Sequence, residues 1–394
     1  MYVGWICGAA AAFYALIAWL AVYLRRCDAT TLPADFAPVS VLKPLCGAEP
    51  HLYECLKSLC DQDFPHFQIV FGVSDPADPA IGVVSRLRQE FPGVDMRLSI
   101  DTRQRGSNRK VSNLRNMLPR ADHQHLILAD SDIVVPRDYL KRVTAPLGDP
   151  QVGIVTCAYA GQPEAGLWSR LGALFINDWF IPSARVAALF GSRGFAFGAT
   201  IALRRDALVS IGGFAAIADQ LADDYRLGEL TRSRGLRTVL SDCVVQTRVS
   251  EPTLLSLIRH KLRWLRTIRA VRPLGYALAF VSFSVPVTLA CVLLTAFSTA
   301  SICMFGLALV ARTLLHREVH RTSLSPFSVA LTLLSDFLTA SLWVWALFMQ
   351  HVQWRDVRYR ITSDGAVEAR SSLACGARET DHSHATPAQR TPSR

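Results

Sequence analysis

Two carboxylates stand one residue apart at the end of an apolar run, in the stretch Leu126-Ile-Leu-Ala-Asp130-Ser-Asp132. Two acids at one strand end repel each other unless a cation or a bound donor group lies between them. The run before them is typical of a buried parallel strand, and open α/β sheets bind ligands at the carboxyl ends of such strands. The stretch therefore predicts a site for a metal ion and a diphosphate, although such a pair by itself is more often a solvated turn or a helix cap.

Further acids stand at the ends of other predicted elements. Asp75, in Ser-Asp-Pro, follows a second apolar run as Asp130 follows the first, although a turn aspartate before proline is the commoner explanation. Asp223 and Asp224 open a predicted helix that ends at Arg234. The helix dipole accounts for one acid in a first turn, but two adjacent acids are more than a cap needs. One of them can serve as a general base if its surroundings raise its pKa towards the working pH.

Two basic segments complete the candidate site. The loop Gly106-Ser-Asn-Arg-Lys110 opens a helix, so its backbone amides and Lys110 suit the phosphates or base of a nucleotide; a solvated loop is the alternative. Ser250-Glu-Pro begins a helix on which Arg259, Arg263 and Arg266 share one face, interleaved with apolar residues. Such a helix is expected to lie in a membrane surface, where Arg263 and Trp264 reach a diphosphate or an acceptor, or where it is a plain anchor to anionic lipid.

The elements that must position these groups follow an α/β pattern from Val39 to about Thr247, where short apolar runs alternate with helical periodicity. The segment from Glu164 to Phe190 has aromatic residues at helical spacing, which indicates either a buried core helix or an interfacial helix beside a lipid. The small residues of Phe195–Thr200 let a backbone approach a ligand closely. The expected strands are 39–42, 69–73, 96–100, 126–129 and 153–157, and the expected helices include 50–61 and 80–91.

Composition indicates a membrane protein. Of 394 residues 51% are hydrophobic, which is too many for an ordinary soluble protein, and the formal net charge is +10. Such a charge suits nucleic acid, anionic lipid or a phosphorylated substrate; beside apolar spans it favours lipid headgroups and a nucleotide over nucleic acid. The ten cysteines have no zinc-type spacing and indicate a reducing compartment.

Apolar segments lie at both ends of the chain. Tyr2–Leu24 has no charged residue and is followed by Arg25 and Arg26, so the positive-inside rule predicts an uncleaved anchor with the following residues in the cytoplasm. The uncharged stretch 276–310 predicts two closely joined helices with Pro286 as a possible kink. A further span, 330–349, contains Asp336, which is expected to face other helices or a wet cavity.

The orientation of the last span stays open. Two basic clusters, 312–321 and 355–360, both favour the cytoplasm, yet one predicted span separates them. Either the last segment is re-entrant or one basic cluster lies outside. Residues 370–394 are small and polar without periodicity, which predicts a disordered tail.

Taken together, the acids and the last basic motif resemble a known series. Asp75, Asp130-Ser-Asp132, Leu-Ala-Asp-Asp224-Tyr and His260-Lys-Leu-Arg263-Trp264 are similar to the D, D, D, (Q/R)xxRW series of family 2-like glycosyltransferases with the GT-A fold. The closer resemblance is to the ceramide glucosyltransferase family. Within it, Val41-Leu-Lys-Pro-Leu-Cys-Gly, Arg109-Lys-Val-Ser-Asn and Phe197-Gly-Ala-Thr resemble the bacterial hopanoid-biosynthesis-associated glycosyltransferases. His260 departs from the family pattern, which has Gln or Arg there.

The resemblance implies a role for each matching residue. Asp75 would contact the uridine of a UDP-sugar, with Lys110 nearby. Asp130 and Asp132 would hold a divalent cation, Mg²⁺ or Mn²⁺, that bridges the two phosphates. Asp224 would be the catalytic base that deprotonates the acceptor hydroxyl. Arg263 and Trp264 would support the leaving diphosphate and the acceptor.

The sequence thus predicts an α/β chain with a cytoplasmic GT-A catalytic domain, a Rossmann-like mixed sheet, between N- and C-terminal transmembrane helices in the cell (inner) membrane. The expected activity is inverting transfer from a UDP-sugar, UDP-N-acetylglucosamine if the hopanoid resemblance holds, to a membrane lipid such as bacteriohopanetetrol, with no protein partner evident. The alternatives are ceramide glucosylation with UDP-glucose, a processive polysaccharide synthase and a non-catalytic lipid-binding scaffold. The expected segments are an anchor at 1–26, the catalytic domain at 38–250, an interfacial helix at 251–272, a membrane region at 273–352 and the tail at 370–394.

Overall fold

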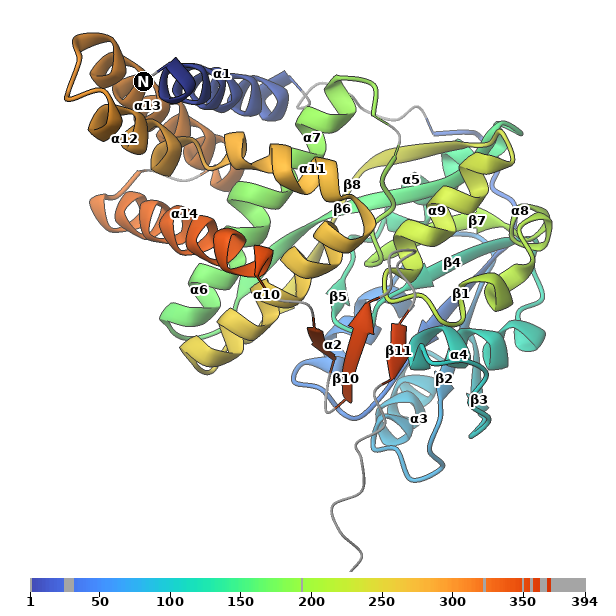
Figure 1. The fold of residues 1–394 in the computed structure, drawn as a ribbon. Helices are drawn as coiled ribbons and strands as arrows, with labels where there is room; N and C mark the ends of the chain where they lie inside the picture. Colours follow the sequence, from blue (N-terminus) through green and yellow to red (C-terminus); the bar gives the residue numbers. More distant parts are fainter. Residues whose placement is uncertain are drawn as a thin grey trace, which may run out of the picture.

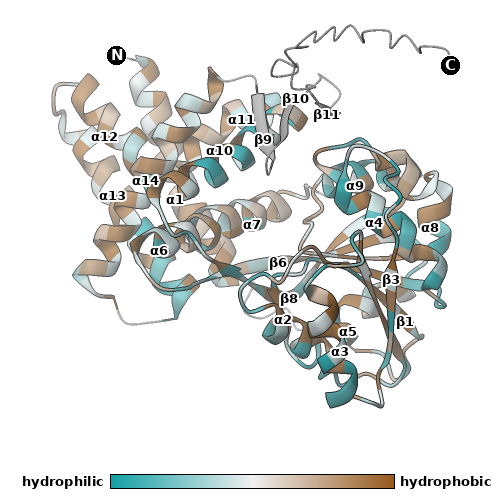
Figure 2. Ribbon diagram, turned by 90° about the horizontal axis from the view of Figure 1, so that it is seen from below, coloured by the Kyte–Doolittle hydropathy of each residue, from teal (hydrophilic) through white to brown (hydrophobic). Residues whose placement is uncertain are grey.

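The computed structural model describes residues 2–24, 32–192, 194–321 and 324–348, together with the backbone of three short strands beyond them. Figure 1 shows a twisted sheet flanked by helices on one side of the molecule and a group of long helices on the other. Hydrophobic residues predominate on the long helices, whereas helices around the sheet, such as α4 and α9, carry hydrophilic ones (Figure 2). The half with the sheet therefore suits water, and the half with the long helices suits lipid.

One sheet organises the first half. Its strand order is β3-β2-β1-β4-β7-β6-β8-β5, and the first four of these are parallel. The chain passes from β1 outward to β3 and resumes with β4 on the other side of β1, so the carboxyl ends of β1 and β4 form the switch point where such sheets bind ligands. The strands are β1 (Val39–Pro44), β2 (Phe67–Val73), β3 (Asp95–Ile100), β4 (His125–Ala129), β5 (Ile133–Val134), β6 (Val152–Pro163), β7 (Thr200–Arg204) and β8 (Arg237–Val249).

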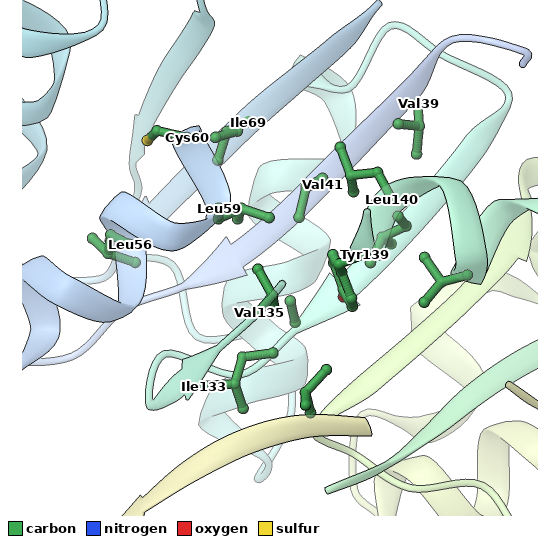
Figure 3. Close-up of a cluster of buried hydrophobic side chains, with 14 of the residues drawn as sticks. Val39, Val41, Leu56, Leu59, Cys60, Ile69, Ile133, Val135, Tyr139 and Leu140 are labelled. Carbon is green, nitrogen blue, oxygen red and sulfur yellow. The ribbon is translucent and has the colours of Figure 1, made fainter. Parts of the chain in front are cut away.

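Apolar side chains leave the central strands on both faces, which is why helices cover both. On one face Val39 and Val41 of β1 pack with Leu56 and Leu59 (Figure 3), and on the other Leu42 packs with residues of α4. The helices of this half are α2 (Leu52–Cys60), α3 (Ala80–Glu90), α4 (Arg109–Met117), α5 (Tyr139–Thr144), α8 (Arg205–Ser210) and α9 (Asp223–Ser233), with short 3₁₀ turns η1 (Leu118–Arg120), η2 (Ala145–Gly148) and η4 (Gly213–Ile217).

The predicted strands and helices of this half are confirmed, with ends that shift by a few residues. Strand β6 is longer than predicted and extends to Pro163 alongside β8. The aromatic segment after it is α6 (Leu167–Leu174), a π-helical turn η3 (Phe175–Phe180) and α7 (Ile181–Leu189). Leu171 and Phe175 are buried, so at least this part of the segment is packed against protein.

The long helices are α1 (Tyr2–Leu24), α13 (Thr299–His320) and α14 (Pro326–Leu347), and each is long and apolar enough to cross a membrane. A fourth candidate is a bent pair in which Pro273–Ser282, formed by α11 (Pro273–Leu278) and η5 (Ala279–Ser282), meets α12 (Ser284–Leu294) at 72°. Helix α1 packs on α12 and α13 through small residues; a Cβ on Gly8 would lie 2.8 Å from Cys291 Sγ. Close approach of this kind is typical of helix pairs in lipid.

Two expectations for this half need correction. The bend lies at Phe283, whereas Pro286 is in the first turn of α12, where a proline removes no helical hydrogen bond. The uncharged stretch does contain two closely joined helices, α12 and the start of α13, but the end of α11 and the turn η5 precede them and were not predicted. Asp336 does face another helix, as predicted, because Arg312 on α13 binds both of its carboxylate oxygens at 2.6 Å.

Helix α10 (Leu254–Val271) connects the two halves. The helix begins later than the predicted start at Ser250-Glu-Pro, and its N-cap is Thr253, whose Oγ1 accepts from Ser256 N at 3.1 Å. Its Leu257, Lys261 and Leu265 are buried, and the helix contacts α6 and α14, so it packs on protein along one face. Past α14 the backbone forms an antiparallel sheet of β9 (His351–Trp354), β10 (Val357–Ile361) and β11 (Val367–Ala369). The side chains of the basic cluster 355–360 and the predicted tail lie outside the described residues.

Candidate active site

The two acids after β4 are held by backbone contacts at the switch point. Asp130 N donates to Ala199 O at 3.2 Å, and the carbonyl of Asp132 accepts from Arg248 N at 3.3 Å. Thr247 Oγ1 donates to Asp132 Oδ2 at 2.9 Å. Loss of water around the carboxylate and the charge of Asp130 raise the pKa of Asp132. These contacts hold both acids in place, but none of them brings a positive charge to the carboxylates.

Lys110 supplies the nearest positive charge. Asn108 caps α4 by accepting from Val111 N at 3.1 Å, which places Lys110 in the first turn. Its Nζ lies 2.6 Å from Asp130 Oδ1 and 3.9 Å from Asp223 Oδ2. Loss of water lowers the pKa of Lys110, but Asp130 and Asp223 together outweigh it and leave the pKa above its usual value. Lys110 is therefore a fixed cation between acids from two elements.

The two acids at the start of α9 have different partners. Asp223 faces Lys110 and accepts from Asn108 Nδ2 at 3.4 Å. Asp224 Oδ2 instead accepts from Gly198 N at 2.8 Å. Loss of water and the neighbouring charge of Asp223 raise the pKa of Asp224 to about 6. Asp224 is thus the acid whose pKa comes near a neutral working pH, as a general base requires.

The small-residue segment explains how Asp224 is positioned. A Cβ at Gly198 would lie 3.1 Å from Asp224 Oδ2, which is closer than an ordinary contact. The predicted close approach of this backbone is therefore real, and in this structure its partner is the Asp224 carboxylate. A side chain at position 198 would displace that carboxylate.

Arg263 and Trp264 reach this region from α10. The charges of Asp130 and Asp132 act on Arg263, whose pKa is lowered by loss of water in spite of them. The ring of Trp264 lies 5.9 Å from Tyr159, 5.6 Å from Phe175 and 5.5 Å from Phe180 between centroids. The helix thus presents a cation and an aromatic wall next to the acids.

Asp75 is the predicted site residue that the structure leaves apart. It follows β2 as expected, but it is exposed and its Oδ1 accepts from Ala77 N at 2.8 Å, as a turn aspartate does. Among the described residues no hydrogen bond or ion pair joins it to Asp130 or Lys110. The buried acid of this loop is Asp78, which accepts from Gly47 N at 3.0 Å and so connects the loops after β1 and β2.

Sequence reasoning missed several residues around the site. Lys43 is the last but one residue of β1, is 1% exposed, and burial lowers its pKa to about 8. Glu251 is buried and its Oε1 lies 2.7 Å from His260 Nδ1, so the residue that departs from the family pattern has an acidic partner. A lysine directly after the expected first strand was the available signal; Glu251 had none, because its partner is nine residues away on a helix.

Two curated relatives of this chain are ceramide glucosyltransferases. Ceramide glucosyltransferase 1 of Caenorhabditis elegans is 25% identical over 62% of this chain and 51% of its own length. The ceramide glucosyltransferase of Komagataella phaffii is 33% identical over 28% of this chain and 23% of its own. The chain thus spans about half the length, or less, of these curated relatives.

A solved mannosyltransferase from Pyrobaculum calidifontis, in complex with GDP-Man and Mn²⁺, has the same fold, with a TM-score of 0.53 and 20% identity over 88% of this chain and 98% of its own. The predicted GT-A architecture is therefore confirmed. The model of glycosyl transferase family 21 matches residues 3–367, so this chain belongs to that family.

Proposed function

We propose that this protein is an inverting membrane glycosyltransferase that moves a sugar from a UDP-sugar to the hydroxyl of a membrane lipid. The observation that carries the proposal is the Asp224 carboxylate, with a pKa raised to about 6, held at the sheet's switch point beside Lys110 and the acids after β4. Family membership supports the reaction class. A lipid acceptor is proposed because apolar helices that could cross a membrane pack against α10, the helix that carries Arg263 and Trp264.

On the donor side, Lys110 binds phosphate or base, and Asp75 binds the uridine from the exposed loop after β2. Asp130 and Asp132 fit a hard divalent cation, Mg²⁺ or Mn²⁺, because they are paired carboxylates that repel each other. Lys110 and Thr247 each engage one oxygen of the pair, which leaves an oxygen of each carboxylate for the ion. When bound, such an ion offsets the charge that develops on a departing diphosphate.

On the acceptor side, Asp224 takes the proton from the lipid hydroxyl as that oxygen bonds to the anomeric carbon. The bond between this carbon and the diphosphate oxygen breaks in the same displacement, and UDP leaves with the electron pair. One displacement without an enzyme nucleophile inverts the anomeric configuration. Arg263 stabilises the leaving diphosphate, and Trp264 with its aromatic neighbours lines the acceptor's path.

The same proposal places the molecule in the cell. Residues 38–250 form the cytoplasmic catalytic domain, 251–272 lie at the membrane interface and 273–352 form the membrane region of an inner-membrane protein. Arg25 and Arg26 after α1 support this orientation.

Two acceptors fit about equally. The motif resemblance favours a hopanoid polyol with UDP-N-acetylglucosamine as donor. The relatives named ceramide glucosyltransferase favour ceramide with UDP-glucose. A processive polysaccharide synthase fits less well, because at most four candidate spans are found among the described residues and His260 replaces the usual first residue of the last motif.

The test is an assay of the full-length protein in detergent with Mg²⁺ or Mn²⁺, a panel of UDP-sugars, bacteriohopanetetrol and ceramide. Mass spectrometry of the lipids and release of UDP are read together. A hexosamine mass on the hopanoid supports the first acceptor, and a hexose mass on ceramide supports the second. No UDP release with any sugar and either lipid would overturn the proposed activity.

A further inference from the structure

A cluster of ionisable side chains lies away from the sheet edge, where η3 meets α13. Asp178 in the π-helical turn has a fully buried side chain, and His316 and His320 point to it from α13. His316 Nδ1 lies 2.7 Å from Asp178 Oδ2, and His320 Nε2 lies 2.7 Å from Asp178 Oδ1. Among the described residues, this is the one group of three or more His, Cys, Asp or Glu side chains whose ligand atoms all lie within 4.8 Å of one another. The proposed function uses none of them.

The arrangement of donors has the form of a metal site. Histidines four residues apart lie on one face of a helix, so the two imidazoles are neighbours, with ring centroids 4.4 Å apart. Two nitrogens and one carboxylate oxygen are a ligand set that transition metals bind. Ligand atoms of a tetrahedral zinc ion lie roughly 3.3 Å apart, so the two 2.7 Å contacts would open by roughly half an ångström.

The surroundings hold the ligands in place. Thr332 Oγ1 on α14 lies 3.1 Å from His316 Nδ1, which brings a further oxygen to the centre. Arg312 lies 3.6 Å from Asp178 Oδ2, but its guanidinium is bound on the other side by Asp336. A π-helical turn costs regular hydrogen bonding and is often found at functional sites, and here it carries Asp178.

Charge limits the alternatives. Arg312 is hydrogen-bonded to Asp336, so among the described residues Asp178 has only the two imidazoles within hydrogen-bonding distance, and its charge is uncompensated there while both are neutral. A buried charge of this kind requires a cation. A proton on one histidine supplies it, and so does a metal ion; the convergence of three ligands from two elements on one point distinguishes the metal.

We propose that Asp178, His316 and His320 bind a divalent transition-metal ion of the zinc type, which fixes α13 to the π-helical turn. This ion differs from the one proposed at Asp130 and Asp132, because nitrogen ligands select zinc-like ions whereas paired carboxylates select Mg²⁺ or Mn²⁺. The side chains of Asp178 and His316 are buried, whereas that of His320 is 26% exposed. Its role is to hold the helix that carries Arg312 against the turn that carries Trp179, next to the aromatic wall.

The experiment measures metal content and does not depend on activity. Full-length protein is purified with an affinity tag that does not bind metal. It is then incubated with ZnCl₂, passed through a desalting column and analysed by elemental mass spectrometry. We expect about one zinc per chain. His320→Gln should lose it, because the amide can still donate to Asp178 but is a poor ligand. His66→Ala, which removes an exposed histidine far along the chain, is the matched control and should keep it.

Two further readouts keep the result decisive. ZnCl₂ should raise the melting temperature of the wild type and of His66→Ala but not of His320→Gln, since a ligand of the folded state stabilises it. Co²⁺ loaded in place of zinc should give visible absorption bands that disappear in His320→Gln. Wild-type protein that retains no zinc, or His320→Gln that retains as much as wild type, would overturn the site and leave a hydrogen-bonded Asp–His pair.

Discussion

The two charged regions of this molecule are built in opposite ways. At the sheet edge, Asp130, Asp132 and Asp224 lie close enough for their charges to interact, Lys110 is bonded to Asp130 alone of the three, and the pKa values of Asp132 and Asp224 are raised. In the helical half, by contrast, Asp336 has both carboxylate oxygens bound by Arg312. A site whose carboxylate charges are only partly balanced by cations is completed by a ligand. A site whose charges are fully balanced holds the fold together. Changes at the first should therefore affect turnover, and changes at the second should affect stability.

The largest effect is expected for Asp224→Asn. The amide cannot take a proton from the acceptor, so kcat should fall by about 10²- to 10⁴-fold, the usual contribution of a general base. The fold should survive, because the amide oxygen can still accept from Gly198 N. UDP release and thermal unfolding are measured on the same preparation, with exposed Asp138→Asn as control. A variant that keeps normal turnover would remove Asp224 from the mechanism.

The opposite pattern is expected for Asp336→Asn. It removes the carboxylate charge that binds buried Arg312 through two hydrogen bonds and leaves Asp178, 3.6 Å away, as the acid beside it; breaking a buried pair costs about 3–5 kcal/mol. The melting temperature in detergent should fall, and any loss of activity should follow the loss of folded protein. The double variant Arg312→Met/Asp336→Leu removes both charges and should recover much of the stability. If the double variant is as unstable as the single one, the pair is not what holds α13 to α14.

Lys110→Ala should weaken donor binding more than chemistry. It removes the positive charge beside Asp130 and Asp223, so the net negative charge of the site increases and repels a diphosphate. We expect the KM for the UDP-sugar to rise by about tenfold, with a smaller change in kcat. Lys57→Ala, at a surface pair with Glu90, is the control and should change neither. If both variants raised KM and lowered kcat to the same extent, the cause would be a general effect on folding.

The smallest effect is a shift in pH dependence. Asp224 must be ionised to act, so kcat/KM should fall as the pH drops below about 6. Asp223→Asn removes a charge that raises this pKa, so the acidic limb should move to lower pH. Because the folded pKa is raised, protonated Asp224 stabilises the fold at low pH, and this contribution is lost as the pH rises through about 6. An unchanged limb in Asp223→Asn would mean that another group sets it.

The sequence was sufficient for the sheet and for most of the site, because local patterns set them: apolar runs end in acids, and a capped helix start carries Lys110. It was insufficient where tertiary contacts decide. Nothing local relates Asp178 to His316, which are 138 residues apart, or shows that Lys261 is buried against α14 instead of lying in solvent. The sequence favours a kink at Pro286, because a proline is a local signal, whereas the bend lies at Phe283, where the sequence has no such signal.

The central claim is that Asp224 drives a single displacement, and the anomeric configuration of the product tests it most directly. The glycolipid made by the purified protein from an α-linked UDP-sugar is isolated, and the coupling constant of its anomeric proton is measured by NMR. Inversion requires a β-linked product that is absent from the Asp224→Asn reaction. An α-linked product would require two displacements or a different mechanism, and would contradict the role of Asp224 as the base of a single displacement.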